Sequence, residues 1–344
     1  MYSSRPSPII PETIYGRLTL FCGIVEAAVI IILESIIAYF FGKSTNPTEG
    51  VVSPVRGIPV YLTVFSLAQV FSVILCWDAL YHKNTIQIIG WVLFNFATFA
   101  YSIFQYNQMI GLFEFDPLNP NPEITDPDAL KSIRPALVVI PIILGVFQLV
   151  DLVLAWKLYQ EFGWRIYKKI GADPRMKNMY RWYQIFLMLL KFDFFFAVGF
   201  TIQFLALILQ KNDPEFAITV AAIPIAAIIT AMAVYGVRRE DRRILAVFML
   251  GLVTLLAYFI FKIWRTYNAQ DPEREKRYQS TRKYLTFFGA LSIFVVAMTL
   301  VVGTICWMNF GRGLQQILLS SGRPSTANAA NGAPRAEQRK PIDV

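Results

Sequence analysis

Eight long apolar stretches dominate the sequence, and they limit the folds that the chain can adopt. A helix needs about 20 apolar residues to cross the roughly 30 Å hydrocarbon core of a bilayer, and each stretch reaches that length. The segments of membrane β-barrels are far shorter and alternate in polarity. The sequence therefore predicts an all-α, polytopic transmembrane helical bundle of about eight spans. The stretches are Leu18–Phe41, Ile58–Tyr81, Thr85–Ile110, Ala136–Trp156, Trp182–Leu209, Phe216–Val237, Ile244–Trp264 and Tyr284–Phe310.

Composition excludes several classes of function. Of 344 residues, 56% are apolar and 16% are charged, whereas a soluble domain carries about 25% charged residues. The net charge of +9 is spread over short clusters between apolar stretches, which indicates membrane topology and no nucleic-acid partner. The single histidine, His82, excludes a two-histidine site, and Cys22, Cys76 and Cys306 form no CxxC pair. We therefore expect a non-enzymatic protein with no catalytic residues, cofactor or metal.

The distribution of basic residues predicts the topology. With a cytosolic N-terminus, the inside segments carry 19 Lys and Arg and the outside loops carry 12, as the positive-inside rule requires. This gives a cytosolic segment at 1–17, the transmembrane bundle at 18–310, and a cytosolic, largely disordered tail at 311–344. Seven of the outside residues lie between Lys262 and Lys283, so the side of the 265–283 loop stays open.

An acidic, proline-rich segment follows the third stretch, from Glu114 to Arg134. Its acidic side chains could offer oxygen ligands to calcium. Their spacing matches no known calcium loop, so we favour a plain solvated loop. The acidic residues concerned are Asp116, Glu123, Asp126 and Asp128.

Ionisable residues inside the apolar stretches are the chemically informative feature, because each costs about 2.5–3.5 kcal/mol near a helix centre. Counting 1.5 Å per residue from the nearest basic loop places four of them at overlapping depths. Lys191 and Asp193 project about 200° apart on one helix, so we predict that Lys191 pairs with Glu26 or Asp151. Asp193 then faces another helix or a polar group such as Gln148 or Asn95. The candidate charge cluster comprises Glu26, Asp151, Lys191 and Asp193.

We place two further acids outside this cluster. Asp78 lies five residues before Lys83 and is expected at the interface, and Glu34 lies nearer the opposite face. The cluster itself has two interpretations. It could line a proton, ion or substrate path, or it could be a buried salt bridge that fixes helix register.

One part of the chain resembles a known family. The segments 169–174, 179–186 and 190–196 read KIGADP, MYRWYQIF and LKFDFFF. This stretch is similar to a family of uncharacterised fungal multi-pass membrane proteins of the Golgi apparatus. The resemblance implies a Golgi or endomembrane location and an integral membrane architecture, and it implies no catalytic residue.

Three functional hypotheses follow. The first is a scaffold, trafficking or cargo-handling protein that acts through its cytosolic loops and tail. Basic loop residues could bind anionic lipid headgroups, although positive-inside topology explains the same residues. The second is a proton- or ion-coupled transporter that uses Lys191 with Glu26 or Asp151. The third, a seven-helix receptor with an additional leading helix, rests on span count alone.

Overall fold

The computed structural model describes residues 11–45, 54–113, 129–170, 173–208, 214–268 and 272–313. These residues form eight long α-helices and one short 3-10 helix, Pro54–Gly57. All eight are long and apolar enough to cross a membrane, so the predicted helical, eight-span architecture is confirmed. The helices are α1 (Ile14–Ser44), α2 (Ile58–Tyr81), α3 (Thr85–Phe113), α4 (Ala129–Ile170), α5 (Pro174–Leu207), α6 (Pro214–Arg239), α7 (Arg242–Tyr267) and α8 (Pro272–Asn309).

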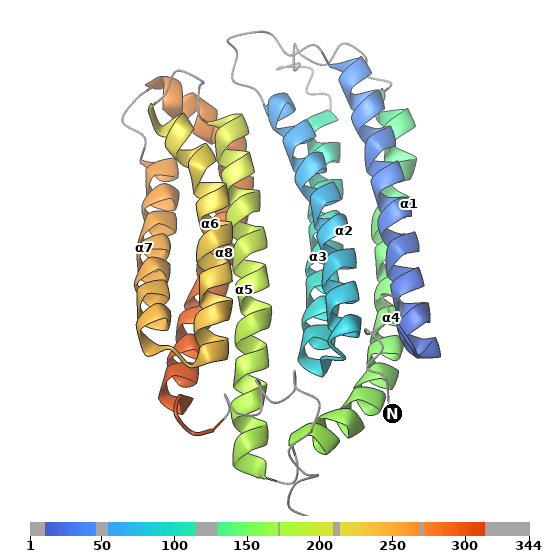
Figure 1. The fold of residues 1–344 in the computed structure, drawn as a ribbon. Helices are drawn as coiled ribbons and strands as arrows, with labels where there is room; N and C mark the ends of the chain where they lie inside the picture. Colours follow the sequence, from blue (N-terminus) through green and yellow to red (C-terminus); the bar gives the residue numbers. More distant parts are fainter. Residues whose placement is uncertain are drawn as a thin grey trace, which may run out of the picture.

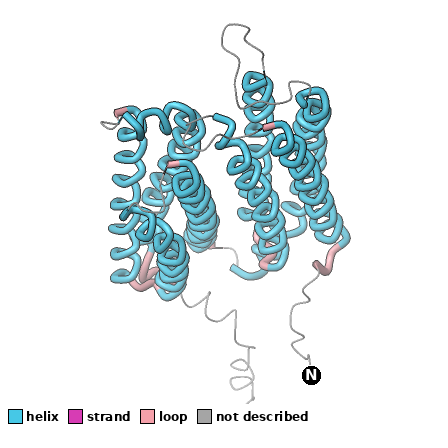
Figure 2. The backbone as a smooth tube through the Cα atoms, turned by 90° about the horizontal axis from the view of Figure 1, so that it is seen from above, coloured by secondary structure: helices cyan, strands magenta, loops and turns pink. Residues whose placement is uncertain are grey.

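The eight helices form two adjacent four-helix bundles (Figures 1 and 2). In the first bundle α1 packs on α2 and α4, and α3 packs on α2 and α4. In the second, α5 packs on α6 and α8, and α7 packs on α6 and α8. Because α1 is a full member of a bundle, the chain is not a seven-helix core with an added leading helix.

Both bundles use the same tight turn between their second and third helices. Lys83 and Glu240 occupy the left-handed region, with φ of 51° and 54°. The next residue, Asn84 or Asp241, donates its N–H back to the preceding helix, to the carbonyl of Ala79 or Gly236. Its side chain then caps the first turn of the following helix. Such paired caps satisfy the free backbone groups at both helix ends.

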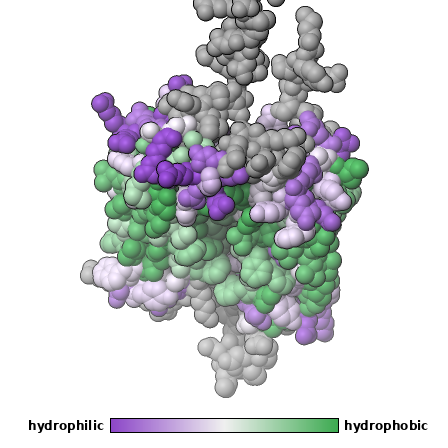
Figure 3. Space-filling view, turned by 90° about the horizontal axis from the view of Figure 1, so that it is seen from below, coloured by the Kyte–Doolittle hydropathy of each residue, from purple (hydrophilic) through white to green (hydrophobic). Residues whose placement is uncertain are grey.

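The outer surface matches a lipid environment. Figure 3 shows a broad apolar band across the molecule, with hydrophilic side chains gathered along its borders. The spans on α6 and α7 are the least buried of the eight, and Ile218, Leu250 and Val247 on them are more than half exposed. A surface of this extent would be a liability in water and is ordinary in a bilayer.

The two bundles meet along a seam, which we define as the contact of α2 and α3 with α5 and α8. Aromatic rings fill much of it. Phe71 stacks on Phe195 with ring centroids 4.6 Å apart, and Tyr101 meets Phe288 edge to face at 6.0 Å. Such pairs add about 0.5–1.5 kcal/mol beyond their buried area. The aromatic run around Phe195 therefore packs within the protein.

The segment between the last two spans is largely helical. The helix α7 ends at Tyr267 and α8 begins at Pro272. Most of the basic residues predicted for a loop at 265–283 therefore belong to the first turns of α8. The acidic segment with the conceivable calcium ligands Asp116, Glu123, Asp126 and Asp128, and most of the 311–344 tail, lie outside the described residues.

Candidate functional site

Lys191 lies in the seam and forms an ion pair with Asp78, which joins α5 of the second bundle to α2 of the first. Both side chains are mostly buried, with 30% and 22% of their surface exposed. His82, one turn after Asp78, approaches the same carboxylate, with Nδ1 3.2 Å from Oδ1. The predicted pairing of Lys191 with Glu26 or Asp151 is therefore wrong.

The error has a physical cause in the length of α5. For Lys191 the nearest basic loop residue is Arg181, and counting depth from it assumes that the membrane begins there. In the structure α5 already begins at Pro174 and Arg181 lies on its second turn. Asp78 lies within one turn of the end of α2. Lys191 therefore sits level with the end of α2 near the α2–α3 turn, where a lysine charge is less costly than at the bilayer centre.

Asp193 lies on the other side of α5 and belongs to the second bundle. Its Oδ2 accepts a hydrogen bond from the hydroxyl of Thr299 on α8, at 2.5 Å. The prediction that Asp193 and Lys191 face different helices is confirmed, since they contact α8 and α2 respectively. The suggested partners Gln148 and Asn95 are wrong, because both lie in the first bundle.

Glu26 and Asp151 are both buried inside the first bundle. Glu26 on α1 is 4% exposed and Asp151 on α4 is fully buried. The four predicted residues thus divide among three places: Lys191 in the seam, Glu26 with Asp151 in the first bundle, and Asp193 in the second.

A chain of hydrogen bonds ends on Asp151. The indole N–H of Trp91 donates to Ser72 Oγ at 2.9 Å, and Ser72 donates to Asn95 Oδ1 at 2.5 Å. The Asn95 amide then donates to Asp151 Oδ2 at 2.9 Å. An indole N–H can only donate, so the direction of the whole chain is fixed. It links α2, α3 and α4 and holds one oxygen of Asp151.

A second buried acid lies two turns further along α1. Both carboxylate oxygens of Glu34 accept from the Gln105 amide on α3, at 3.0 and 3.1 Å. Glu34 is 1% exposed. The first bundle therefore has a polar interior at two levels.

The sequence contained a signal for this interior that the prediction missed. Polar or hydrogen-bonding side chains recur along α3 at intervals of three and four residues, which places them on one helical face. All of them are buried. The stripe comprises Gln87, Trp91, Asn95, Thr98, Ser102 and Gln105.

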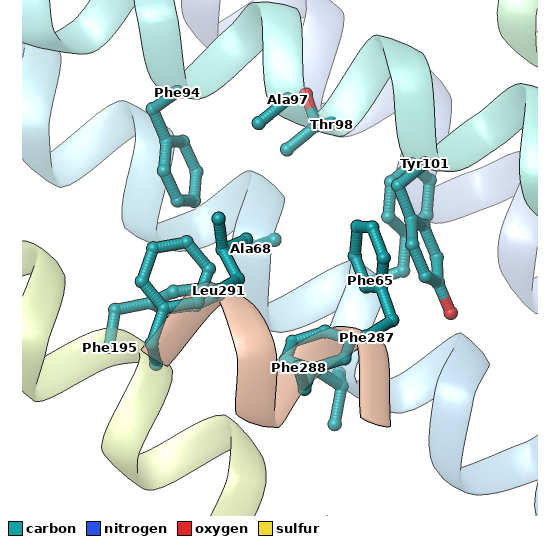
Figure 4. A pocket seen from close by; sticks show the side chains of 12 residues that line it. Phe65, Ala68, Phe94, Ala97, Thr98, Tyr101, Phe195, Phe287, Phe288 and Leu291 are labelled. Atoms are coloured by element: carbon teal, nitrogen blue, oxygen red, sulfur yellow. The ribbon is translucent and has the colours of Figure 1, made fainter. Parts of the chain in front are cut away.

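One cavity lies in the seam, with a volume of about 40 Å³ (Figure 4). Phenylalanine rings from α2, α3, α5 and α8 surround it, including Phe65, Phe94, Phe195 and Phe288. The lining is almost wholly apolar, so this space provides no polar path between the bundles. None of the four residues of the predicted charge cluster lines it.

Metal and thiol chemistry find little support in the described part of the chain. No group of three or more His, Cys, Asp or Glu side chains that could hold a metal occurs there. Cys22, Cys76 and Cys306 are all free thiols. The last two are buried within the bundles.

We predict that the α2–α3 turn confers a small pH dependence on stability. The hydrogen bond to Asp78 raises the pKa of His82 above its ordinary value of about 6.5. Folding therefore favours the imidazolium form, and this stabilisation is complete below the ordinary pKa and lost as pH rises through the raised one. The nearby Lys191 charge opposes the shift. Thermal unfolding between about pH 6 and pH 8 should show the decline.

The control for this prediction is His82→Gln, which keeps a side chain able to hydrogen-bond but does not titrate in this range. The variant should lose the part of the pH slope that belongs to His82. An unchanged slope would show that Asp78 does not hold His82 in its charged form.

Comparisons with known proteins show which protein family this chain resembles. Residues 170–309 match a domain of unknown function (DUF7789), and these bounds coincide with the second bundle. The chain is 30% identical over 280 residues to a UPF0658 Golgi apparatus membrane protein of Schizosaccharomyces pombe. The match covers 76% of this chain and 78% of that relative. No solved structure matches the chain.

Proposed function

Since the chain belongs to the family of UPF0658 Golgi apparatus membrane proteins, we propose that it is a non-enzymatic scaffold of the Golgi membrane with a trafficking or cargo-handling role. It is a multi-pass protein with eight helices able to span the bilayer. The family description gives no molecular activity, so the role is inferred from the surface. The observation that supports it is a set of exposed basic residues, mostly arginines, at the end of both bundles that holds the α2–α3 and α6–α7 turns.

This basic end is the lower end of the molecule in Figure 1. Side-chain contacts tie its segments together. Glu12 pairs with Lys83 at 2.8 Å, and Arg242 donates to the Phe310 carbonyl at 3.4 Å. Glu240 accepts from the Gly311 N–H at 2.7 Å. The basic end comprises Arg17, Lys83, Arg175, Lys177, Arg181, Arg238, Arg239, Arg242, Arg243 and Arg312.

The charges of the basic end are only partly balanced. Glu12 and Glu240 are engaged in the contacts above, and Asp173 and Asp241 cap α5 and α7. Most of the arginines point into solvent. Each basic residue beside an anionic leaflet contributes about 1 kcal/mol of attraction. The basic end therefore suits anionic headgroups, and a scaffold anchored in this way could hold cargo or coat proteins against one leaflet.

The transporter hypothesis in its original form required Lys191 to pair with Glu26 or Asp151. Lys191 instead contacts Asp78. The scaffold role is therefore the better supported of the two.

A pair of substitutions tests the lipid contact. Arg175→Gln with Arg243→Gln removes two exposed charges while leaving the backbone N–H groups that Asp173 and Asp241 cap. In nanodiscs of mixed phosphatidylcholine and phosphatidylserine, enrichment of phosphatidylserine around the protein should fall by about 30-fold, from about 2 kcal/mol of lost attraction. The matched control is Lys43→Gln with Arg134→Gln, which removes two exposed charges from the opposite end.

A cell-based measurement tests the role itself. In cells lacking the protein, resident Golgi glycosyltransferases should lose their normal distribution, and the wild-type chain should restore it. The Arg175→Gln, Arg243→Gln variant should restore it poorly, whereas the control pair should restore it fully. Full rescue by the first variant, or proton or ion flux in proteoliposomes of the purified protein, would contradict the proposal.

A further inference from the structure

The two bundles repeat one four-helix plan in the same orientation. In each, the first helix packs on the second, the second on the third, the third on the fourth and the fourth on the first. The helices have 31, 24, 29 and 42 residues in the first bundle and 34, 26, 26 and 38 in the second. The shared turn at Lys83 and Glu240 lies at the same end of both bundles (Figure 1). Thus α1 corresponds to α5, α2 to α6, α3 to α7 and α4 to α8.

Buried aromatic residues support this correspondence. Trp91 and Phe248 each lie seven residues after the residue that caps the third helix of their bundle, and both are buried. Trp91 lies beside Gly23 on α1. Phe248 meets Phe186 on α5 edge to face, with ring centroids 6.1 Å apart. Gly23 and Phe186 therefore mark equivalent levels on the first helices of the two bundles.

The bundles meet head to tail along the seam. The first bundle contributes α2 and α3, and the second contributes α5 and α8, which correspond to α1 and α4. The contact therefore joins two different faces of the repeated unit, as in a heterologous interface between subunits. One face of each kind is left at the outer ends of the molecule: α6 and α7 at one end, and α1 and α4 at the other (Figure 1).

The burial of the spans follows this arrangement. In α2 and α3, 50% and 56% of the apolar span is buried, but in their counterparts α6 and α7 only 11% and 22% is buried. The value is 44% for both α5 and α8, and 33% for both α1 and α4. The helices that have a bundle packed against them are therefore more buried than their counterparts at the outer ends.

Seam residues of α2 have exposed counterparts on α6. Phe71, which stacks on α5, lies twelve residues before the turn residue, and the residue at that distance on α6 is Ile228. Asp78 lies five residues before the turn residue, and its counterpart is Tyr235. Ile228 is 61% exposed and Tyr235 is 55% exposed. The described residues thus leave uncovered the face of α6 that matches the seam face of α2.

The same relation holds between α5 and α1. Counted from the equivalent levels on the two helices, Phe195 corresponds to Ile32, and Lys191 corresponds to Ala28. Ile32 and Ala28 are both exposed. The outer face of α1 therefore matches the face that α5 presents to the seam.

We propose that a second copy of this chain packs its α1 and α4 face on the outer face of α6 and α7, and so repeats the seam between molecules. Because the two bundles have the same orientation, this contact keeps all copies in one orientation in the membrane. A head-to-tail contact builds a ring if its rotation closes and an open row if it does not. The proposal does not rest on the scaffold role.

The chemistry of the outer faces suits such a contact. Apolar helices associate in a bilayer through close packing, which small residues permit. Ala221 and Ala217 lie two and three turns before Ile228 and are exposed. The ion pair of the seam has no charged counterpart, because its two positions hold Ala28 and Tyr235. The contact between copies is therefore made by apolar and aromatic side chains.

Cysteine cross-linking between two differently tagged copies tests the proposal, in native membranes and in a cysteine-free background of the full chain. One copy carries Tyr235→Cys and the other carries Ala28→Cys. With a short bifunctional maleimide, the product that contains both tags should be about tenfold more abundant than in the control, because a specific contact raises the effective concentration of the two thiols. The matched control replaces Tyr235→Cys with Ile89→Cys, which lies five residues after the cap of α3 and is 47% exposed.

Three results would overturn the proposal. Equal product from the Ile89→Cys control would show random collision. Product that joins Tyr235→Cys to Tyr235→Cys, in preference to Ala28→Cys, would show a two-fold contact in which the same face meets itself. Absence of product between copies, from protein that is correctly inserted in the membrane, would show that lipid covers both outer faces.

Discussion

Replacing Trp91 with alanine is expected to destabilise the protein by about 3–5 kcal/mol, the largest effect that we predict for a single residue. Trp91 is 1% exposed and is the largest fully buried side chain described. Its ring lies against α1, within 3.8 Å of the space beside Gly23. Truncation leaves a cavity between α1, α2 and α3, and it also removes the N–H that orders Ser72 and Asn95.

The comparison that checks this prediction is Trp77→Ala, measured by unfolding in mixed micelles. Trp77 is on α2 but is 37% exposed and stacks on Tyr81 near the end of that helix, so its loss should cost under about 1.5 kcal/mol. Trp91→Phe keeps an aromatic ring in the core but removes the indole N–H. We expect it to destabilise the protein by about 1 kcal/mol, from the lost hydrogen bond to Ser72. A larger effect at Trp77 than at Trp91 would contradict the packing of the first bundle.

The second large effect concerns the ion pair in the seam. Lys191→Met should destabilise the protein by about 2 kcal/mol, because it leaves the mostly buried Asp78 carboxylate with only His82. This value lies between the cost of breaking an exposed pair and a fully buried one. Adding Asp78→Asn should recover part of the loss, since it removes the unpaired charge.

The matched control for the seam is Lys157→Met, which removes an exposed lysine from α4 and should change stability by under about 0.5 kcal/mol. The pair is expected to be coupled, so the losses of Lys191→Met and Asp78→Asn should sum to more than the loss of the double variant. Strictly additive losses would show that the two side chains do not interact.

The architecture could be predicted from the sequence because membrane helices depend on local properties. Each span is a run of apolar residues whose length is fixed by the bilayer. Every predicted stretch, from Leu18–Phe41 onward, falls largely on one of the eight helices. The division into two bundles could not be predicted in this way, because it depends on which helices contact one another.

Only part of the candidate site could be predicted, because the contacts between helices also decide which charged residues meet. The presence of buried acids and a lysine followed from their positions in apolar stretches. To predict which residues they contact, one must know the relative heights of the helices in the membrane. Counting residues from the nearest basic loop gives the wrong height for Lys191, because α5 begins at Pro174. Asp78 was left out of the predicted charge cluster because it was expected at the membrane interface. Lys191 lies at the same level and pairs with it. The stripe on α3 that contains Asn95 is visible in the sequence from its spacing of three and four residues.

The two bundles meet along a seam in which Lys191 contacts Asp78 and not Glu26 or Asp151, which lie inside the first bundle. Cysteine cross-linking tests it most directly, in a background with Cys22, Cys76 and Cys306 replaced by alanine. With a short bifunctional maleimide in native membranes, the Asp78→Cys, Lys191→Cys protein should cross-link efficiently. The Glu26→Cys, Lys191→Cys and Asp151→Cys, Lys191→Cys proteins should not. Cross-linking of Lys191→Cys to either of those positions in preference to Asp78→Cys would show that Lys191 faces the interior of the first bundle and not the seam.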